Sequence, residues 1–310
     1  MQNIAIRTEN LSRDFDTVRA VDGLTLEVPR GIVFGFLGPN GAGKTTTIRL
    51  LLGLLEPTAG HAEVLGFNTR RQSNAIRERA GALLEHHGLY ERLSAYDNLD
   101  FYARIWRLPK GERESRIEEL LTHMGLWERR HEKAGDWSKG MKQKLAVVRA
   151  LLHRPSLVFL DEPTAGLDPV AAAALREDIA GLAVHEGTTV FLNTHNLAEA
   201  EKLCDLVGVI RAGKLLTVGH PDILRANTGA PHVEVYGRGF SDDVLVALHT
   251  YPEIRDVQVR DAHLHLNLAQ PMGNAPLVRM LVNAGVEIEE VRNGKNSLEE
   301  VFLTLLEEQA

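Results

Sequence analysis

The sequence contains only one cysteine, Cys204, among its 310 residues. A single cysteine excludes an intrachain disulfide and any metal site built from several cysteine ligands. The sequence also lacks a run of about 20 apolar residues, the length that a membrane-spanning helix needs, and its first residues lack the apolar core of a secretory signal. We therefore expect a soluble, cytoplasmic chain that reaches a membrane only through a partner.

An excess of basic charge is also missing. The chain carries 35 Lys and Arg residues against 42 Asp and Glu residues, a net charge of −7. This balance argues against a protein that coats nucleic acid or an anionic membrane surface. The acidic excess lies in the last quarter, because residues 230–310 hold 6 basic and 13 acidic side chains, whereas residues 1–229 hold 29 of each.

The first part of the chain, residues 1–226, is predicted to form one α/β domain. Alternating apolar residues predict short strands at 4–7 and 24–28, and later apolar runs alternate with helical patterns up to a last strand at 206–210. A helical insertion at about residues 88–153 interrupts the alternation. Strands and helices that alternate on both sides of an insertion indicate a mostly parallel sheet covered by helices.

A change of character at the glycine- and proline-containing stretch 219–231 predicts a domain boundary. Beyond it, residues 230–310 read as strand, helix, strand, strand, helix, strand and a final helix. This order predicts a small α+β accessory domain of the ferredoxin-like, split βαβ type. A chain of 310 residues is long enough for two such domains.

A phosphate-binding loop follows the apolar stretch Ile32–Leu37, which predicts a buried strand. Residues Gly38–Thr45 match G-x-x-x-x-G-K-[ST] at every fixed position, and a helical pattern follows. Glycines let backbone N–H groups turn toward a phosphate at the helix N-terminus. Lys44 would place its charge on the β- and γ-phosphates, and the Thr45 hydroxyl would bind Mg²⁺. The predicted nucleotide-binding residues here are Gly38, Pro39, Asn40, Gly41, Ala42, Gly43, Lys44, Thr45 and Thr46.

A second nucleotide signature is the apolar stretch Leu157–Leu160, which ends in Asp161 and Glu162. Carboxylates at this end of a strand lie where α/β sheets bind ligands. We predict that Asp161 holds the metal ion through water and that Glu162 is the general base for the attacking water. Taken alone, two acidic residues after a buried strand could also be a solvent-exposed strand end without a catalytic role.

Three segments carry a family resemblance. Asp161–Asp168 resembles the Walker B motif and D-loop of ATP-binding-cassette (ABC) ATPases, Trp137–Lys144 resembles their signature motif, and Asn193–His195 resembles their switch segment. The resemblance covers about residues 4–225 and implies a P-loop ATPase core with a helical subdomain. It implies ATP and Mg²⁺ as ligands and ATP hydrolysis by the nucleotide-binding subunit of an ABC transporter. It also implies a homodimer that closes on ATP and drives a separately encoded transmembrane permease.

The resemblance implies roles for single residues as well. Ser138, Gly140 and Asp168 would contact the ATP held by the second subunit. His195 would contact the γ-phosphate. The implied catalytic set is Glu162, His195 and Lys44, and the implied metal-binding set is Thr45, Glu85 and Asp161.

Two motifs depart from the family pattern. Lys139 and Met141 replace the first Gly and the Gln of the usual signature Leu-Ser-Gly-Gly-Gln, whereas Ser138 and Gly140 remain. Glu85 stands where a Gln usually contacts Mg²⁺ and the membrane partner; its carboxylate would bind the metal or its waters, although a surface glutamate would also fit. Both departures look like a branch of ABC ATPases that power bacterial exporters.

Other candidates have weaker support. Phe15 stands where the family has an aromatic side chain that stacks on adenine, and an ordinary core phenylalanine would fit equally well. Among 13 histidines only His195 receives a role. The pair at 86–87 has no evident ligand partner. His263 and His265 share one strand face and are expected at the surface, so no metal is assigned to either pair.

Two other classes of protein remain as alternatives. A DNA-repair or chromosome-maintenance ATPase would need a long coiled-coil insertion between Lys44 and Asp161, where only the helical subdomain stands. A ribosome-associated ABC protein would carry two cassettes and basic tracts. The segment 297–303 resembles the C-terminal extension of drug and antibiotic exporter ATPases, which favours export. We expect no nucleic-acid partner and a location at the inner face of the cell membrane, through the permease.

Overall fold

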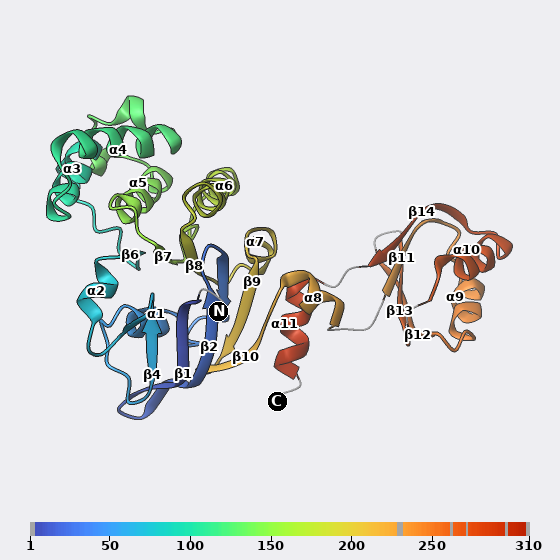
Figure 1. The fold of residues 1–310 in the computed structure, drawn as a ribbon. Helices are drawn as coiled ribbons and strands as arrows, with labels where there is room; N and C mark the ends of the chain where they lie inside the picture. Colours follow the sequence, from blue (N-terminus) through green and yellow to red (C-terminus); the bar gives the residue numbers. More distant parts are fainter. Residues whose placement is uncertain (1–3, 228–231, 261–262, 271, 295–296, 308–310) are drawn as a thin grey trace. The chain divides into compact units, whose positions relative to one another are not determined.

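The computed structural model describes residues 4–227, 232–260, 263–270, 272–294 and 297–307. It divides the chain into two compact units, residues 1–221 and 222–310 (Figure 1). In the described parts of both units, no helix is long and apolar enough to cross a membrane.

A six-stranded sheet forms the centre of the first unit. Its strand order is β10-β9-β3-β8-β7-β6, and all neighbours are parallel except β9 and β10. The strands β3, β7 and β8 are buried along their whole length, which explains their continuous apolar sequences. The bounds are β3 Val33–Leu37, β6 Ala80–Leu83, β7 Leu157–Asp161, β8 Thr189–Thr194, β9 Leu206–Arg211 and β10 Lys214–Gly219.

A second, antiparallel sheet has the order β2-β1-β4-β5. The bounds are β1 Ile4–Phe15, β2 Val18–Pro29, β4 Ala59–Val64 and β5 Phe67–Asn68. The short strands predicted at 4–7 and 24–28 are therefore only parts of two 12-residue strands. The prediction was too short because irregularities in the β1–β2 register, such as the shift between Thr8 and Leu11, interrupt the apolar alternation.

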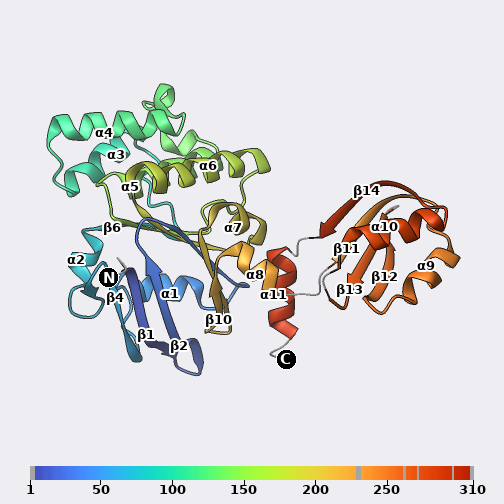
Figure 2. The same ribbon diagram turned by 45° about the vertical axis from the view of Figure 1, so that its right-hand side comes forward.

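Several helices of the first unit begin at a capping side chain. The bounds in the first unit are α1 Lys44–Leu51, α2 Ser73–Arg77, α3 Ala95–Ile105, α4 Lys110–His123, α5 Lys139–Leu151, α6 Pro169–Glu186 and α7 Leu197–Leu203. The side chains of Ser94, Ser138 and Asp168 accept hydrogen bonds from the first turns of α3, α5 and α6. The helical insertion consists of α3, α4 and α5, which lie together (Figure 2), with short 3₁₀ turns at 127–129 and 134–136.

The strand predicted as the last of the first domain, 206–210, is followed by one more. A two-residue turn, Ala212-Gly213, reverses the chain from β9 into β10, and both residues have positive φ values of 46° and 82°. Such a turn suits a tight hairpin. Gly213 N–H donates to the Ala42 carbonyl at 3.0 Å. The β9–β10 hairpin, whose second strand was not predicted, therefore also supports the phosphate loop. The helix α8, Pro221–Asn227, occupies part of the expected boundary loop.

The second unit has the predicted strand and helix order. It runs β11 His232–Arg238, α9 Asp242–His249, β12 Ile254–Arg260, β13 His263–Leu268, α10 Asn274–Asn283, β14 Glu287–Gly294 and α11 Leu298–Glu307. The sheet order is β12-β13-β11-β14 with antiparallel neighbours, the split βαβ arrangement. Val233, Val235 and Leu264 belong to one apolar core with residues of α9 and α10. The alternate residues of β11 therefore lie on the opposite face of the sheet.

Candidate nucleotide-binding site

A cavity of about 450 Å³ lies at the carboxyl ends of β3, β7 and β8. Three separate parts of the first unit frame it: the loop before α1, the ends of the two neighbouring strands, and the segments at 18–20 and 212. This edge is where parallel α/β sheets bind ligands. The lining residues are Val18, Arg19, Ala20, Asn40, Gly41, Gly43, Lys44, Thr45, Thr46, Asp161, Glu162, Asn193 and Ala212.

The glycines of the loop meet two different requirements. Gly41 and Gly43 have φ values of 80° and 102°, in the left-handed region that glycine adopts without strain. Space is limiting at Gly38 and Gly43, where an added Cβ would lie 2.3 Å from the Ile210 carbonyl oxygen and 2.2 Å from that of Ala20. Glycine at these positions therefore lets the loop pack directly against the neighbouring backbone and adopt the turn that the motif predicts.

Lys44 is the first residue of α1, and its side chain is 7% exposed. Its ammonium group donates to the carbonyl oxygens of Gly38 at 2.9 Å and Pro39 at 3.2 Å. It also lies 3.7 Å from Glu162 Oε1. These contacts hold a positive charge inside the loop, at the position where terminal phosphates would enter.

Asp161 ends β7 and is directly paired with Asn193 of β8 in the parallel register. The Thr45 hydroxyl donates to Asp161 Oδ2 at 2.7 Å, and the Asn193 amide donates to Asp161 Oδ1. A carboxylate and a hydroxyl oxygen in contact are hard oxygen ligands that suit Mg²⁺. Thr45 and Asp161 are thus close enough to bind one metal ion together, as their predicted role requires. Asn193 was not singled out from the sequence, because its pairing depends on strand register.

Glu162 has a positive φ of 50°, and its N–H donates to the Asn193 carbonyl at 2.8 Å. Its Oε2 lies 2.7 Å from His195 Nδ1. The other oxygen, Oε1, is buried and has no hydrogen-bond partner among the described residues. A carboxylate oriented by an imidazole, with one oxygen turned toward the pocket cation, is well placed to accept a proton from water.

Glu199 is a buried neighbour of the site that no sequence pattern indicated. It is 1% exposed, and its Oε2 accepts from Thr164 at 3.1 Å and Thr194 at 2.9 Å. It thereby links the loop after β7 to the segment that carries His195. Burial raises the pKa of Glu199, while the two threonine hydroxyls oppose that rise. No local pattern marks this residue, since its partners lie 35 and 5 positions away.

Phe15 and Glu85 lie outside the lining of the cavity, as do Gly38, Pro39, Ala42 and His195, which were also predicted. Glu85 has a side chain that is 58% exposed and forms an ion pair with Arg49 at 3.2 Å. Phe15 is 39% exposed, with the Arg13 guanidinium 4.5 Å from its ring centre. The exposed ring excludes the reading of Phe15 as an ordinary core side chain. A role for either residue in binding remains a prediction.

The predicted in-trans residues also lie apart from the lining of their own chain's cavity. Ser138 and Asp168 cap α5 and α6, respectively. The two caps approach one another: a Cβ on Gly140 would lie 3.7 Å from Leu167 Cδ2, and one on Gly166 would lie 2.1 Å from Lys139 Nζ. Lys139, which replaces the usual glycine, therefore folds onto the loop between Asp161 and Asp168.

The strand–loop–helix unit, the buried lysine and the paired acids at the sheet edge define a P-loop ATPase. Comparison with known proteins gives the family. A family model for ABC transporters matches residues 21–165. The chain is 36% identical over 304 residues to the bacitracin transport ATP-binding protein BcrA of Bacillus licheniformis, with 97% of both chains covered. It is 36% identical over 310 residues to the daunorubicin resistance ATP-binding protein DrrA3 of Streptomyces coeruleorubidus, with 98% of this chain and 96% of that one covered.

A solved ATP-binding subunit of an ABC transporter is 33% identical and matches 72% of this chain and 92% of its own, with a TM-score of 0.65. The chain therefore belongs to the ATP-binding subunits of ABC transporters, and it is an ATP-hydrolysing, nucleotide-binding subunit. This confirms the family, the fold class and the ATPase activity that the motifs implied. It also sets aside the DNA-maintenance and ribosome-associated alternatives.

Proposed function

We propose that the chain powers the export of antibiotic-like compounds through a separately encoded membrane permease. The observation that carries this proposal is the similarity along the whole chain, C-terminal unit included, to proteins named for bacitracin transport and daunorubicin resistance. The departures at Lys139, Met141 and Glu85 add support, because the resemblance associates them with exporter ATPases.

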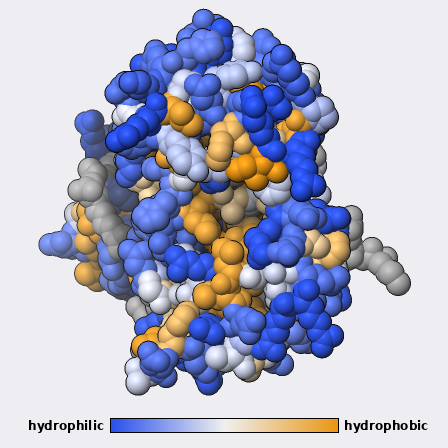
Figure 3. All heavy atoms as spheres, turned by 90° about the vertical axis from the view of Figure 1, so that its left-hand side faces the viewer, coloured by the Kyte–Doolittle hydropathy of each residue, from blue (hydrophilic) through white to orange (hydrophobic). Residues whose placement is uncertain are grey.

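An exposed apolar surface on the first unit supports a membrane partner. Tyr90, Leu93, Phe101 and Ile105 are exposed, and they lie on the segment after Glu85 and on α3. The Tyr90 and Phe101 rings pack edge to face, with centroids 5.1 Å apart. Figure 3 shows hydrophobic residues gathered around a hollow on the face that it presents. Exposed aromatic and aliphatic side chains close together in the chain favour an interface, and we assign them to a cytoplasmic helix of the permease.

In the proposed cycle, two copies of the chain close on two ATP molecules. Ser138 and Asp168 support this arrangement because each caps a helix at a distance from its own chain's phosphate loop. The first turn of α5 offers backbone N–H groups to an anion, and the γ-phosphate held by the other copy would be that anion.

The residues of the pocket then have separate tasks in hydrolysis. Thr45 and Asp161 would hold Mg²⁺, which neutralises charge on the β- and γ-phosphates. Lys44 binds the same phosphates. Glu162 accepts a proton from water as the water oxygen bonds to the γ-phosphorus and the bond to the leaving ADP oxygen breaks. His195 orients the Glu162 carboxylate and contacts the γ-phosphate from the side.

The substitution Glu162→Gln tests this division of tasks. It keeps the shape of the side chain and removes the charge that opposes ATP, so binding should survive while the hydrolysis rate falls by about 10²–10⁴-fold. Light scattering with Mg-ATP should then show a stable dimer for Glu162→Gln and a mostly monomeric parent. Glu128→Gln, on an exposed 3₁₀ turn, is the matched control. A Glu162→Gln protein that hydrolyses ATP at the parent rate would remove Glu162 from the role of base.

Export itself is tested in cells. The parent chain, expressed with a candidate membrane permease, should raise the resistance of a drug-sensitive host to a peptide or anthracycline antibiotic. The same membrane protein with Glu162→Gln should not. Equal sensitivity with and without the parent pair, across both drug classes, would contradict the assignment to antibiotic export.

A further inference from the structure

The open face of the sheet in the second unit carries a group of side chains that the ATPase cycle does not use. On β11, Val233 and Val235 point into the core, so His232, Glu234 and Tyr236 occupy the other face. In the register of β11 with β13, Glu234 lies directly opposite His265. From the sequence, His265 was expected at the surface with His263 and without a metal, whereas the structure places two candidate ligands beside it.

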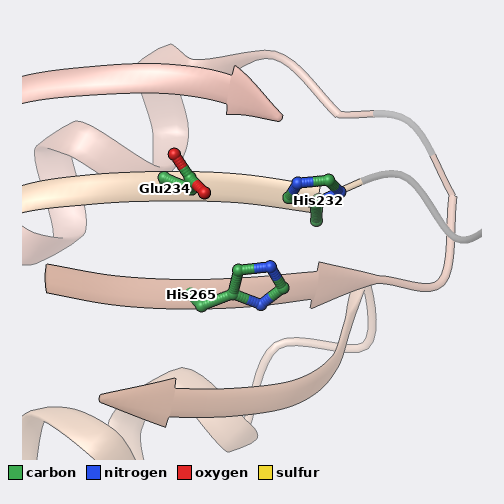
Figure 4. Close-up of side chains that lie close together, drawn as sticks. All are labelled: His232, Glu234 and His265. Atoms are coloured by element: carbon green, nitrogen blue, oxygen red, sulfur yellow. The ribbon is translucent and has the colours of Figure 1, made fainter. Parts of the chain in front are cut away.

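His232, Glu234 and His265 form one compact cluster. One potential ligand atom from each side chain lies within 4.8 Å of the others, and in the described residues this is the one group of three or more such side chains that meets that spacing. Figure 4 shows His232 and Glu234 on one strand and His265 on its neighbour. The two imidazole rings are stacked, with centroids 4.8 Å apart and an angle of 23° between their planes.

The surroundings hold these side chains in place. His232 is 8% exposed, and its ring lies over Gly294 of β14, where a Cβ would come within 1.8 Å of Nε2. Any larger residue at position 294 would displace the ring. The Tyr236 hydroxyl donates to Glu234 Oε2 at 3.0 Å, which orients the carboxylate. Partners of this kind are what orient metal-binding side chains in known sites.

The guanidinium of Arg292, next to the cluster, already pairs with another carboxylate. Arg292 of β14 is the cross-strand neighbour of Glu234. Its guanidinium makes two hydrogen bonds to Glu290, at 2.7 and 2.8 Å, and lies over the Tyr236 ring at 5.0 Å. Arg292 therefore does not engage Glu234 in the two-bond contact that it makes with Glu290, and among the described residues the carboxylate keeps an oxygen for another ligand.

We propose that His232, Glu234 and His265 bind a divalent transition-metal ion of the zinc type. Two imidazoles and one carboxylate form the nitrogen-rich donor set that Zn²⁺ accepts, whereas Mg²⁺ prefers oxygen ligands alone. Bonds of about 2.0–2.2 Å place the ligand atoms of a tetrahedral site about 3.4 Å apart. The cluster is wider than this by little more than an ångström, and this is the distance by which the ligand atoms would have to approach one another to bind one ion. The fourth position would take water or a further ligand.

This site differs from the magnesium position in the first unit in donor type and in location. Thr45 and Asp161 offer only oxygen ligands, so an ion that prefers nitrogen ligands should bind the histidine cluster and not the magnesium position. A bound ion would join β11 to β13 across their hydrogen-bonded pair and would stabilise the folded accessory domain, because it binds only that state.

Titration of the metal-free full-length protein with Co²⁺ and then Zn²⁺, without nucleotide, tests the proposal. Co²⁺ in a site of low coordination number gives visible absorption bands, and Zn²⁺ should displace it. The parent should bind one equivalent at this site. Loss of an orienting partner alone costs about 10–100-fold in metal affinity, so His265→Ala and Glu234→Gln should each weaken binding at least about tenfold.

His263→Ala is the matched control. His263 lies two positions along the same strand and stacks on Tyr236 at 4.9 Å, outside the cluster. This variant should keep the parent's Co²⁺ spectrum and Zn²⁺ affinity. Glu234→Gln keeps the size of the side chain, and a thermal unfolding curve like that of the parent establishes that it is folded.

Two results would overturn the proposal. One is a parent protein that shows no Co²⁺ band and no Zn²⁺ binding in the micromolar range. The other is a band and an affinity that persist in folded His265→Ala and Glu234→Gln, since the ion would then be bound by other histidines. ATP binding in the first unit provides an independent measure and should be the same in all variants.

Discussion

The Lys44 ammonium is held by two backbone carbonyl oxygens and faces the carboxylate of Glu162 across 3.7 Å. At the scale of single residues, this arrangement determines how the pocket handles charge. Asp161 and Glu162 line the same cavity, and both would repel a nucleotide phosphate if no cation stood between them. Lys44 is thus needed both to attract the phosphates and to offset the acids that serve the later chemistry.

Lys44→Ala is expected to abolish or strongly weaken Mg-ATP binding. A hydrogen bond to a charged partner contributes about 1.5–3 kcal/mol, which corresponds to roughly 10- to 100-fold in affinity. Titration with a fluorescent ATP analogue measures the change. Lys110→Ala, whose side chain is 79% exposed, is the control and should bind like the parent. Unchanged affinity in Lys44→Ala would refute the assignment of the loop.

Residues of the site were predictable from the sequence where they are contiguous. Gly38 to Thr46 form one uninterrupted motif whose chemistry is local, so the sequence alone identifies it. No role was predicted for Asn193 or Glu199, because Asn193 meets Asp161 across two strand ends 32 residues apart, and Glu199 of α7 meets Thr164 of the loop after β7, 35 residues away. The cluster around His265 was hidden for the same reason, since strand register creates it.

At the scale of elements, sequence signals were reliable where burial is uniform. The parallel strands β3, β7 and β8 are buried on both faces, and β13 of the second unit alternates buried and partly exposed residues in a regular way. The sheet of β1, β2 and β4 was predicted only in part, because bulges break its alternation. The hairpin strand β10 was missed, because its burial is partial and its turn is short.

The helical region has one element-level contact that should respond to pH. Trp106, just after α3, stacks on His153, just after α5, with ring centres 3.9 Å apart. Burial lowers the pKa of His153 from its usual 6.5 to about 4. Between pH 6.5 and 4 His153 is protonated in the unfolded chain but stays neutral in the folded chain. The free energy of unfolding therefore falls as the pH drops through this range.

His153→Phe removes this titration and keeps an aromatic face against Trp106. The free energy of unfolding should therefore depend less steeply on pH in the variant than in the parent, between pH 6.5 and 4. Urea denaturation at several pH values in that window measures it. His131→Phe, which changes a histidine beside Tyr96, controls for the loss of any imidazole. Parallel pH profiles for parent and His153→Phe would contradict the assignment.

At the scale of the whole molecule, the nucleotide cavity and the excess of acidic residues lie in different parts of the chain. All the side chains that line the nucleotide cavity lie between Val18 and Ala212, within the unit that ends at residue 221. The acid excess lies in residues 230–310, and negative charge there would repel a nucleotide. We infer that the second unit regulates or stabilises the dimer and takes no part in ATP binding.

A chain that ends at Ala226 tests this separation. Each unit has its own apolar core, so the shortened protein should fold, and it should bind Mg-ATP with the affinity of the full-length chain because no lining residue is lost. Combined with Glu162→Gln, the truncation should weaken the ATP-bound dimer seen by light scattering if the second unit supports dimer formation. A protein that ends at Ala226, folds by circular dichroism and yet binds no nucleotide would show that the second unit contributes to the site. If the truncated Glu162→Gln protein instead forms an ATP-bound dimer as stable as that of full-length Glu162→Gln, the second unit does not support dimer formation. The assignment of nucleotide binding to the first unit would be unaffected.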